Sequence, residues 1–246
     1  TDKQVDATGM LALSRFAAIC DSLLTPRNMR WHKLQANDAY VMKDRDVRLW
    51  FEEVENILFK HRYAPHANFV SQNQQCFQSL GAFGTAAMFV DEFDGALYGN
   101  TRGIRYKALP LGEVFLRENH QGIVNGMIRW FRMTAQQAYS VPGWKDTFPE
   151  QLMTPLKQNS QQLFNFIHRV CPRTDYDAGR LDYRGKPFTS QYISLDAKCL
   201  LSEGGYTTFP IPCSRYDQAP GETYGRSPAM LVLADQGLAR GVFAAF

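Results

Sequence analysis

The chain has 246 residues, 45% of them hydrophobic and 21% charged, so it can bury a substantial core as one large domain or two small ones. Its formal net charge of +3 is well short of the dense lysine and arginine surface of a dedicated DNA-reading protein. No apolar run reaches the roughly 18 residues of a membrane-spanning helix. Five widely spaced cysteines without a C-x-x-C pair indicate free thiols in a reducing compartment and not a disulfide framework.

The first 80 or so residues carry the apolar periodicity of helices. A first helix is predicted over 9–24, where apolar residues recur on one face and Thr25-Pro26 ends the run. A second helix follows Asp44 and Asp46, whose carboxylates suit the positive end of the helix dipole. Its apolar stripe is expected to face the core, Trp50 and Phe51 included; the stripe consists of Val47, Trp50, Phe51, Val54, Ile57 and Leu58.

A third helix is predicted to start near Pro65, with Gly81 closing it in the left-handed conformation. Between the first two helices, Trp31 stands in a basic cluster that includes Arg30 and His32. A basic cluster around an aromatic side chain is compatible with nucleic-acid binding. A solvated loop whose Trp31 is anchored in the core is the favoured interpretation.

After Gly81 the pattern changes to short apolar runs separated by turn residues, which predicts strands. The strands are expected over 85–91, 103–109, 113–117, 123–132, 162–170, 188–195 and 199–201, with short helices over 135–139 and 148–157. The segments 119–122 and 204–205 are predicted turns, and prolines confine 207–216 to an edge or a loop. The alternation around Trp130 indicates a sheet with both faces partly covered.

These elements predict an α+β fold in which N-terminal helices precede a mainly antiparallel β-rich region that ends in the start of a helix. Three segments are expected: helices over 1–82, a β-rich part over 83–220, and a turn with a helix start over 221–246. We find no internal repeat and no low-complexity tract.

The stretch 221–230 is the organising feature of the C-terminal part. Gly221 and Gly225 bracket a turn that contains Tyr224, and Arg226 stands just before the predicted helix. Ser227 is a suitable N-cap, because its hydroxyl accepts a hydrogen bond from an amide of the first turn. Proline is well tolerated in the position after it, where its ring already fixes a helical φ. The stretch therefore predicts a corner that starts a helix in a set direction.

Enzyme signatures are absent: the sequence has no G-x-S-x-G, P-loop, H-E-x-x-H or Rossmann glycine pattern. Asp91, Glu92 and Asp94 form an acidic cluster that a hydrolase or nuclease would use with Mg²⁺, although a solvated turn is favoured. The acidic loop with Asp175 and Asp182 lacks the order of an EF-hand and is interpreted as a turn-rich loop. We therefore predict no catalytic residue, no metal site and no cofactor.

Several motifs together resemble the head-to-tail connecting (portal) proteins of short-tailed, T7-like bacteriophages. The run Gly-Glu-Thr-Tyr-Gly-Arg-Ser-Pro-Ala-Met over 221–230, followed by Leu233-Ala-Asp235, resembles the family signature. The run Leu-Gly-Ala-Phe-Gly-Thr-Ala-Ala-Met over 80–88 resembles the family's glycine turn from helix to strand. Further similar segments lie over 6–9, 108–113, 206–210 and 214–216, so the resemblance covers almost the whole chain.

The resemblance implies a structural protein and not an enzyme. Such proteins form a ring, usually of twelve subunits, at one capsid vertex in the virion, and double-stranded DNA passes through it without sequence specificity during packaging and ejection. The implied partners are further copies of the chain, the terminase, a capsid or scaffolding protein and tail adaptors, with assembly in the cytoplasm of the bacterial host and no membrane.

By the same resemblance the chain corresponds to the wing, and the stem, clip and C-terminal parts are not in this sequence. Gly237 and Gly241 depart from the long apolar helix with which family members continue. The residues expected to act as a structural hinge or as subunit contacts are Gly81, Gly84, Thr85, Gly221, Tyr224, Gly225, Arg226 and Ser227. The alternative functions are a phage adaptor or scaffold module that binds other phage proteins, and the Mg²⁺-dependent hydrolase or nuclease above.

Overall fold

The computed structural model of the chain describes residues 7–93, 95 and 102–233. Its contacts divide the chain into two compact units. One, called here the helical unit, comprises Thr1–Leu109 and Pro212–Phe246, and the other, the sheet unit, comprises Pro110–Ile211. The segments 1–82, 83–220 and 221–246 predicted from the sequence concern functional parts and stay a prediction.

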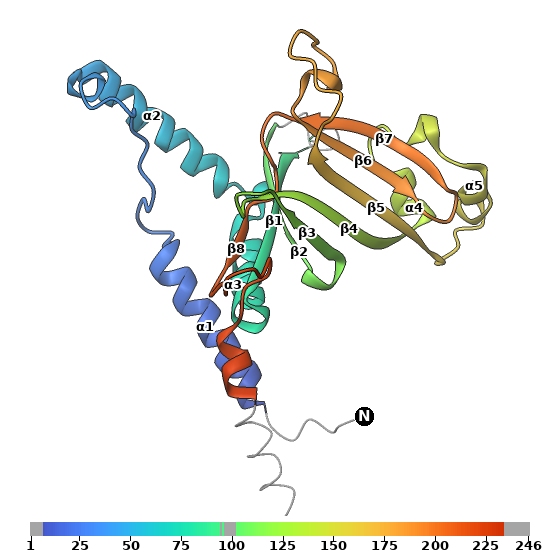
Figure 1. The fold of residues 1–246 in the computed structure, drawn as a ribbon, viewed down its shortest axis with the longest axis horizontal. Helices are drawn as coiled ribbons and strands as arrows, with labels where there is room; N and C mark the ends of the chain where they lie inside the picture. The colour runs from blue at the N-terminus through green and yellow to red at the C-terminus, as the bar shows by residue number, and fades with distance from the viewer. Residues whose placement is uncertain (1–6, 94, 96–101, 234–246) are drawn as a thin grey trace, which may run out of the picture. The chain divides into compact units, whose positions relative to one another are not determined.

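Among its described residues the helical unit contains α1, α2, α3, the start of a further helix over 228–233, and a three-stranded antiparallel sheet with strand order β2-β1-β8. Figure 1 shows α3 beside this sheet, with which it is in contact. The elements are α1 (Thr8–Leu24), η1 (Val41–Lys43), α2 (Arg45–Arg62), η2 (Pro65–Ala67), α3 (Phe69–Phe83), β1 (Thr85–Phe93), β2 (Gly103–Leu109) and β8 (Cys213–Arg215).

The predicted helix ends are confirmed at two of three places. Asp44 is the N-cap of α2 and accepts a hydrogen bond from the amide of Asp46, and Thr25 ends α1. The prediction that Gly81 closes the third helix was wrong: α3 runs on to Phe83, and Gly84 ends it with a φ of 74°. Gly81 lies inside the helix and packs against α1. Glycine suits this contact because a Cβ atom at this position would lie 2.7 Å from Cδ1 of Phe16.

The core of the helical unit lies where the loop after α1 and the start of α3 meet the sheet. Phe69 and Tyr106 are buried there with their rings 4.9 Å apart. Trp31 packs on Phe69 and donates a hydrogen bond from Nε1 to the hydroxyl of Tyr63 at 3.0 Å. Trp31 is thus anchored in a core, as the favoured interpretation of its basic cluster predicted.

Only part of the apolar stripe of α2 is covered within the helical unit, so the prediction was wrong for Trp50 and Ile57. Of the residues of α2, all of which the structure describes, only Glu55 is buried. Trp50 is 58% exposed and Ile57 48%, whereas Phe51, Val54 and Leu58 are half-buried. The stripe is wide enough to have two sides, and only one of them contacts the rest of the unit.

The sheet unit is a five-stranded antiparallel sheet with order β3-β4-β5-β6-β7, so consecutive strands are neighbours. Figure 1 shows its two short helices, α4 and α5, gathered at one end of the sheet. The elements are η3 (Leu111–Glu113), β3 (Val114–Glu118), β4 (Val124–Thr134), α4 (Ala135–Tyr139), η4 (Lys145–Thr147), α5 (Glu150–Lys157), β5 (Leu163–Pro172), η5 (Tyr183–Gly185), β6 (Phe188–Ser194) and β7 (Cys199–Tyr206).

Local sequence signals place most of these elements correctly. Thr134 caps α4 in a reciprocal capping box with Gln137, and the turn over 119–122 joins β3 to β4 with Gly122 at a φ of 74°. The predicted turn at Gly204 and Gly205 was wrong, because both lie within β7 and pair with β6. Gly205 is required there for close packing: a Cβ atom would lie 2.9 Å from the carbonyl oxygen of Phe188.

The core of the sheet unit lies on one face of its sheet. Phe131 and Phe166 pair across β4 and β5 and pack with the fully buried Trp144 and with Leu152 of α5. On the opposite face, called here the open face, Ile128 and Trp130 are each 43% exposed. The prediction that both faces are partly covered agrees with these exposures, because the open face is covered at one end, where Cys171 and Thr189 are buried.

The α+β prediction is confirmed, with helices first and antiparallel sheets after them. Helical backbone follows Ser227 over 228–233, so the described part of the chain does end in the start of a helix. All five cysteines are free thiols, as predicted from their spacing.

Candidate functional site at the glycine junction

The two glycine motifs that carry the family resemblance, about 140 residues apart in sequence, are in direct contact inside the helical unit. The amide of Gly225 donates a hydrogen bond to Oγ1 of the fully buried Thr85 at 2.8 Å. The hydroxyl of Ser227 donates to the carbonyl of Ala82 at 2.9 Å. We call this contact, formed by residues 82–85 and 225–227, the glycine junction.

Glycine is required on both sides of the junction because the two backbones approach without side chains between them. A Cβ atom at Gly84 would overlap the backbone of Gly225 and Arg226, and one at Gly225 would overlap the carbonyl of Gly84. Gly84 also has a positive φ of 74°, which L side chains rarely adopt. The amide of Tyr216 donates to the carbonyl of Gly84 at 2.9 Å, so the end of α3 is fixed to the start of the last turn.

Ser227 has two functions at once. Its Oγ atom accepts a hydrogen bond from the amide of Met230 at 3.1 Å, which is the predicted N-cap contact. The same hydroxyl donates the hydrogen bond to the carbonyl of Ala82 near the end of α3, and Ser227 is only 2% exposed. The last helix therefore starts at a point fixed to the third helix, which sets its direction.

Arg226 is held within the chain at the rim of the junction. Its amide donates to the carbonyl of Asp217 at 2.6 Å, and its guanidinium forms a two-pronged ion pair with Glu222, with Nη2 2.6 Å from Oε1. The hydrogen bond from Arg226 holds the pKa of the Glu222 carboxyl below its usual value, and the same pairing raises the pKa of Arg226. Because this pair is solvent-exposed, its role is to keep the turn closed and not to add a buried charge.

The other predicted residues lie at different distances from this contact. Gly81 is buried at the α1–α3 contact one turn earlier, while Gly221, at a φ of 82°, lies in an exposed turn with open space around it. Tyr224 is 36% exposed beside Gly225. The sequence motifs identified both halves of the junction, but no sequence signal showed that Thr85 and Gly225 bind each other or that Ala82 and Tyr216 take part.

The acidic candidates do not form a catalytic arrangement among the described residues. Asp91 and Glu92 are consecutive in β1, so their side chains point to opposite faces of the strand. Asp94 lies outside the described residues. Within 7–93, 95 and 102–233, no three His, Cys, Asp or Glu side chains gather closely enough to hold a metal ion, and no helix is long and apolar enough to cross a membrane.

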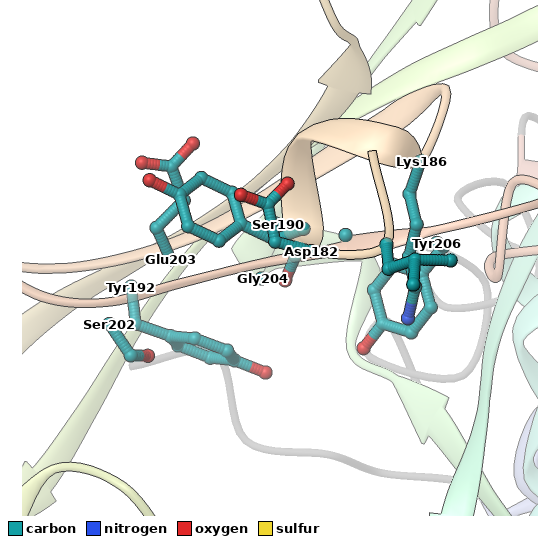
Figure 2. Close-up of a pocket in the computed structure, with 11 residues that line it drawn as sticks. Asp182, Lys186, Ser190, Tyr192, Ser202, Glu203, Gly204 and Tyr206 are labelled. Carbon is teal, nitrogen blue, oxygen red and sulfur yellow. The ribbon is translucent and has the colours of Figure 1, made fainter. Parts of the chain in front are cut away.

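A pocket of about 430 Å³ lies in the sheet unit, between β6, β7 and the acidic loop (Figure 2). Tyr192 and Tyr206 line it together with Lys186, Asp182 and Glu203. The two carboxylates are already neutralised: Asp182 pairs with Arg180, and Glu203 accepts from the buried Arg173 at 2.9 Å. Arginines thus pair with acids of the loop, Arg180 with Asp182 and Arg173 with Asp175.

The sequence is similar to a known protein family and to two portal proteins. The family model described as bacteriophage head to tail connecting protein matches residues 1–239. A portal protein of Salmonella phage epsilon15 is 29% identical over 235 residues, which are 94% of this chain and 41% of that protein. A probable portal protein of Bordetella phage BPP-1 is 28% identical over the same length, 40% of its own. The chain thus spans about two fifths of the length of these relatives, and it belongs to the bacteriophage head-to-tail connecting protein family.

Proposed function

We propose that this chain is the wing region of a portal subunit. Copies of it form a closed ring, of twelve by analogy with the family, at one vertex of the capsid in the virion. The observation that carries the proposal is the family match over residues 1–239, together with the direct contact between the two glycine motifs on which the resemblance rests.

The surface of α1 supports assembly into a larger particle. Of the residues of α1, which the structure describes completely, only Ala17 is buried. The exposed apolar side chains are Met10, Leu11, Ile19, Leu23 and Leu24, each more than half exposed. A helix with this much uncovered apolar surface is typical of a protein that associates with others. Ring closure by head-to-tail contacts between identical subunits covers such surfaces on every copy.

The glycine junction suits the corner of a portal subunit. Gly84, Thr85, Gly225 and Ser227 fix the start of the last helix, described over 228–233, to the end of α3. Arg226 and Tyr224 are exposed at this corner and are proposed as contacts with a neighbouring subunit. Gly81 and Gly221 complete the hinge residues of the proposal.

In this role the partners are the terminase during packaging, a capsid or scaffolding protein, and tail adaptor proteins, with assembly in the cytoplasm of the bacterial host. Double-stranded DNA passes through the ring without sequence-specific contacts. The small net charge of +3 suits a channel through which DNA slides, because each phosphate contact adds affinity that must be broken again.

Electron microscopy of the purified chain, alone and joined to the rest of its protein, tests the proposal. We expect closed rings with an open central channel wide enough for duplex DNA. A protein that stays monomeric at all concentrations contradicts it. Compact assemblies without a channel point instead to an adaptor or scaffold module.

A further inference from the structure

We infer that α2 of one copy of this chain docks its exposed ridge on the open face of the five-stranded sheet of the next copy. The inference rests on the proposed ring and names the surfaces that would form one of its contacts. The α2 ridge consists of Asp46, Leu49, Trp50, Glu53 and Ile57, which share one side of the helix at its 3.6-residue period. Leu49, Trp50 and Ile57 are about half exposed or more.

The open face has the matching apolar row. Trp130, Ile167, Ile193 and Leu200 lie opposite one another on β4, β5, β6 and β7. Trp130 is 43% exposed and Leu200 is 47% exposed. The neighbouring Phe115 and Ile128 are 58% and 43% exposed. A sheet that is apolar on both faces is stable when a layer covers each of them, and here α4 and α5 belong to the core on the other face only.

The two surfaces also match in length. From Asp46 to Ile57 the ridge extends about 16 Å at 1.5 Å per residue. The row from β4 to β7 crosses three strand spacings, or about 14 Å. A single helix laid across the four strands is therefore long enough to cover the row.

Charge selects α2 over α1 as the docking helix. The open face has arginines around its apolar row, Arg117, Arg132 and Arg169, all exposed. The α2 ridge contributes Asp46 and Glu53, also exposed. In α1 the one acid, Asp21, already accepts a hydrogen bond from Thr25 and lies 4.0 Å from Arg27. Opposite charges around an apolar centre favour correct docking over other pairings.

Residues of the ridge and of the open face are exposed, and the proposed ring supplies a second copy as the partner. Each copy offers one of each surface, so the contact is head-to-tail and propagates to a ring or a filament.

A mixture of two blocked variants tests this contact directly. Trp50→Glu blocks the ridge and Trp130→Glu blocks the open face, while Leu181→Glu, at a fully exposed position of the acidic loop, is the matched control.

We expect each blocked variant alone to lose assembly through this contact, and an equal mixture of the two to form 1:1 dimers in analytical ultracentrifugation. Dimers are the end point because the remaining surfaces of the pair are both blocked. The Leu181→Glu control is expected to assemble like the unchanged chain. Circular dichroism and melting curves verify that the variants are folded.

Charge exchange provides a second readout that does not depend on the tryptophans. In the copy that offers its open face, Arg132→Glu together with Arg169→Glu is expected to weaken the 1:1 contact about tenfold. Asp46→Lys together with Glu53→Lys in the copy that offers its ridge is expected to restore it.

A mixture that stays monomeric, or blocked variants that assemble like the unchanged chain, overturns the inference. If rings form and neither blocking substitution affects them, this contact is refuted but the portal proposal stands. If the contact between α2 and the sheet forms filaments and no rings, the contact is supported and the ring is refuted. An unchanged chain that stays monomeric overturns both.

Discussion

The two units bury their apolar residues in different ways. The sheet unit has a continuous core, in which Trp144, Phe166 and Leu152 are almost wholly buried between one face of the sheet and two short helices. The long helices of the other unit, α1 and α2, bury one residue each. The sheet unit is therefore stabilised chiefly by its own core, whereas α1 and α2 leave much of their apolar surface in water, which is typical of surfaces that bind other proteins.

The largest expected effect comes from removing a core side chain of the sheet unit. Phe166→Ala deletes a fully buried ring that stacks near Phe131 and Trp144, and we expect a loss of about 3–5 kcal/mol in the free energy of unfolding. The matched change Trp50→Ala, on the exposed side of α2, is expected to stay within about 0.5 kcal/mol. Urea denaturation of the two variants measures both, and similar losses would remove the contrast between the units.

The glycine junction is the exception in the helical unit, because it is internally complete. Gly84→Ala introduces a Cβ atom into the backbone of Arg226 at a positive φ, and we expect it to cost more than about 2 kcal/mol. Gly122→Ala is the control, since it has the same φ of 74° but open space around it, and strain alone costs about 1–2 kcal/mol. Equal melting temperatures for the two variants would mean that the backbones at the junction separate easily.

The hydrogen bond across the junction is expected to have a smaller effect. Thr85→Val keeps the shape of the side chain but leaves the buried amide of Gly225 without its acceptor, at a cost of about 1–3 kcal/mol. Thr85→Ser retains the hydroxyl and is expected to recover most of this. Hydrogen exchange at Gly225 provides the local measurement: unchanged protection in Thr85→Val would show that this bond is not what holds the junction.

The cysteines of the helical unit allow thiol reactivity to be compared at positions whose pKa is raised strongly or less strongly by burial. Burial raises the pKa of the Cys76 thiol to about 11 and of the Cys213 thiol to about 12. A raised pKa leaves less of the reactive thiolate at pH 8, so we expect both to be modified by a thiol reagent only when the unit unfolds. Cys20 on α1 is half-buried and is expected to react in the folded chain. Peptide mapping by mass spectrometry distinguishes the sites, and rapid modification of Cys213 without denaturant would contradict the described packing.

Local sequence signals predicted the elements well, and pairings in space poorly. The caps at Asp44 and Thr134 and the turn at Gly122 lie within a few residues of the groups they satisfy, so they can be predicted from sequence. Gly84 was predicted as a site residue, but the end of α3 was assigned to Gly81. Either glycine is suitable for a helix end, and only the contact of Gly81 with α1 distinguishes the two positions. The bond between Thr85 and Gly225 joins residues 140 positions apart, for which a single sequence contains no local signal.

The error at Trp50 has a more general physical reason. Helical periodicity shows that a stripe of side chains is destined for an apolar environment, but it does not show whether that environment belongs to the same chain or to a neighbour. Trp130 is a related case, since it lies on the less covered face of its sheet and is 43% exposed. In the proposed assembly, other copies cover these surfaces.

The four tryptophans allow the most direct test of the claim that these open surfaces are contacts between copies. Trp144 is buried, Trp31 is half-buried, and Trp50 and Trp130 are exposed in the single chain. Hydroxyl-radical oxidation, read by mass spectrometry for dilute and assembled protein, measures the accessibility of each side chain. We expect assembly to protect Trp50 and Trp130 strongly while Trp144 stays protected throughout. Equal oxidation of Trp50 and Trp130 in both states would show that the contacts between copies lie elsewhere.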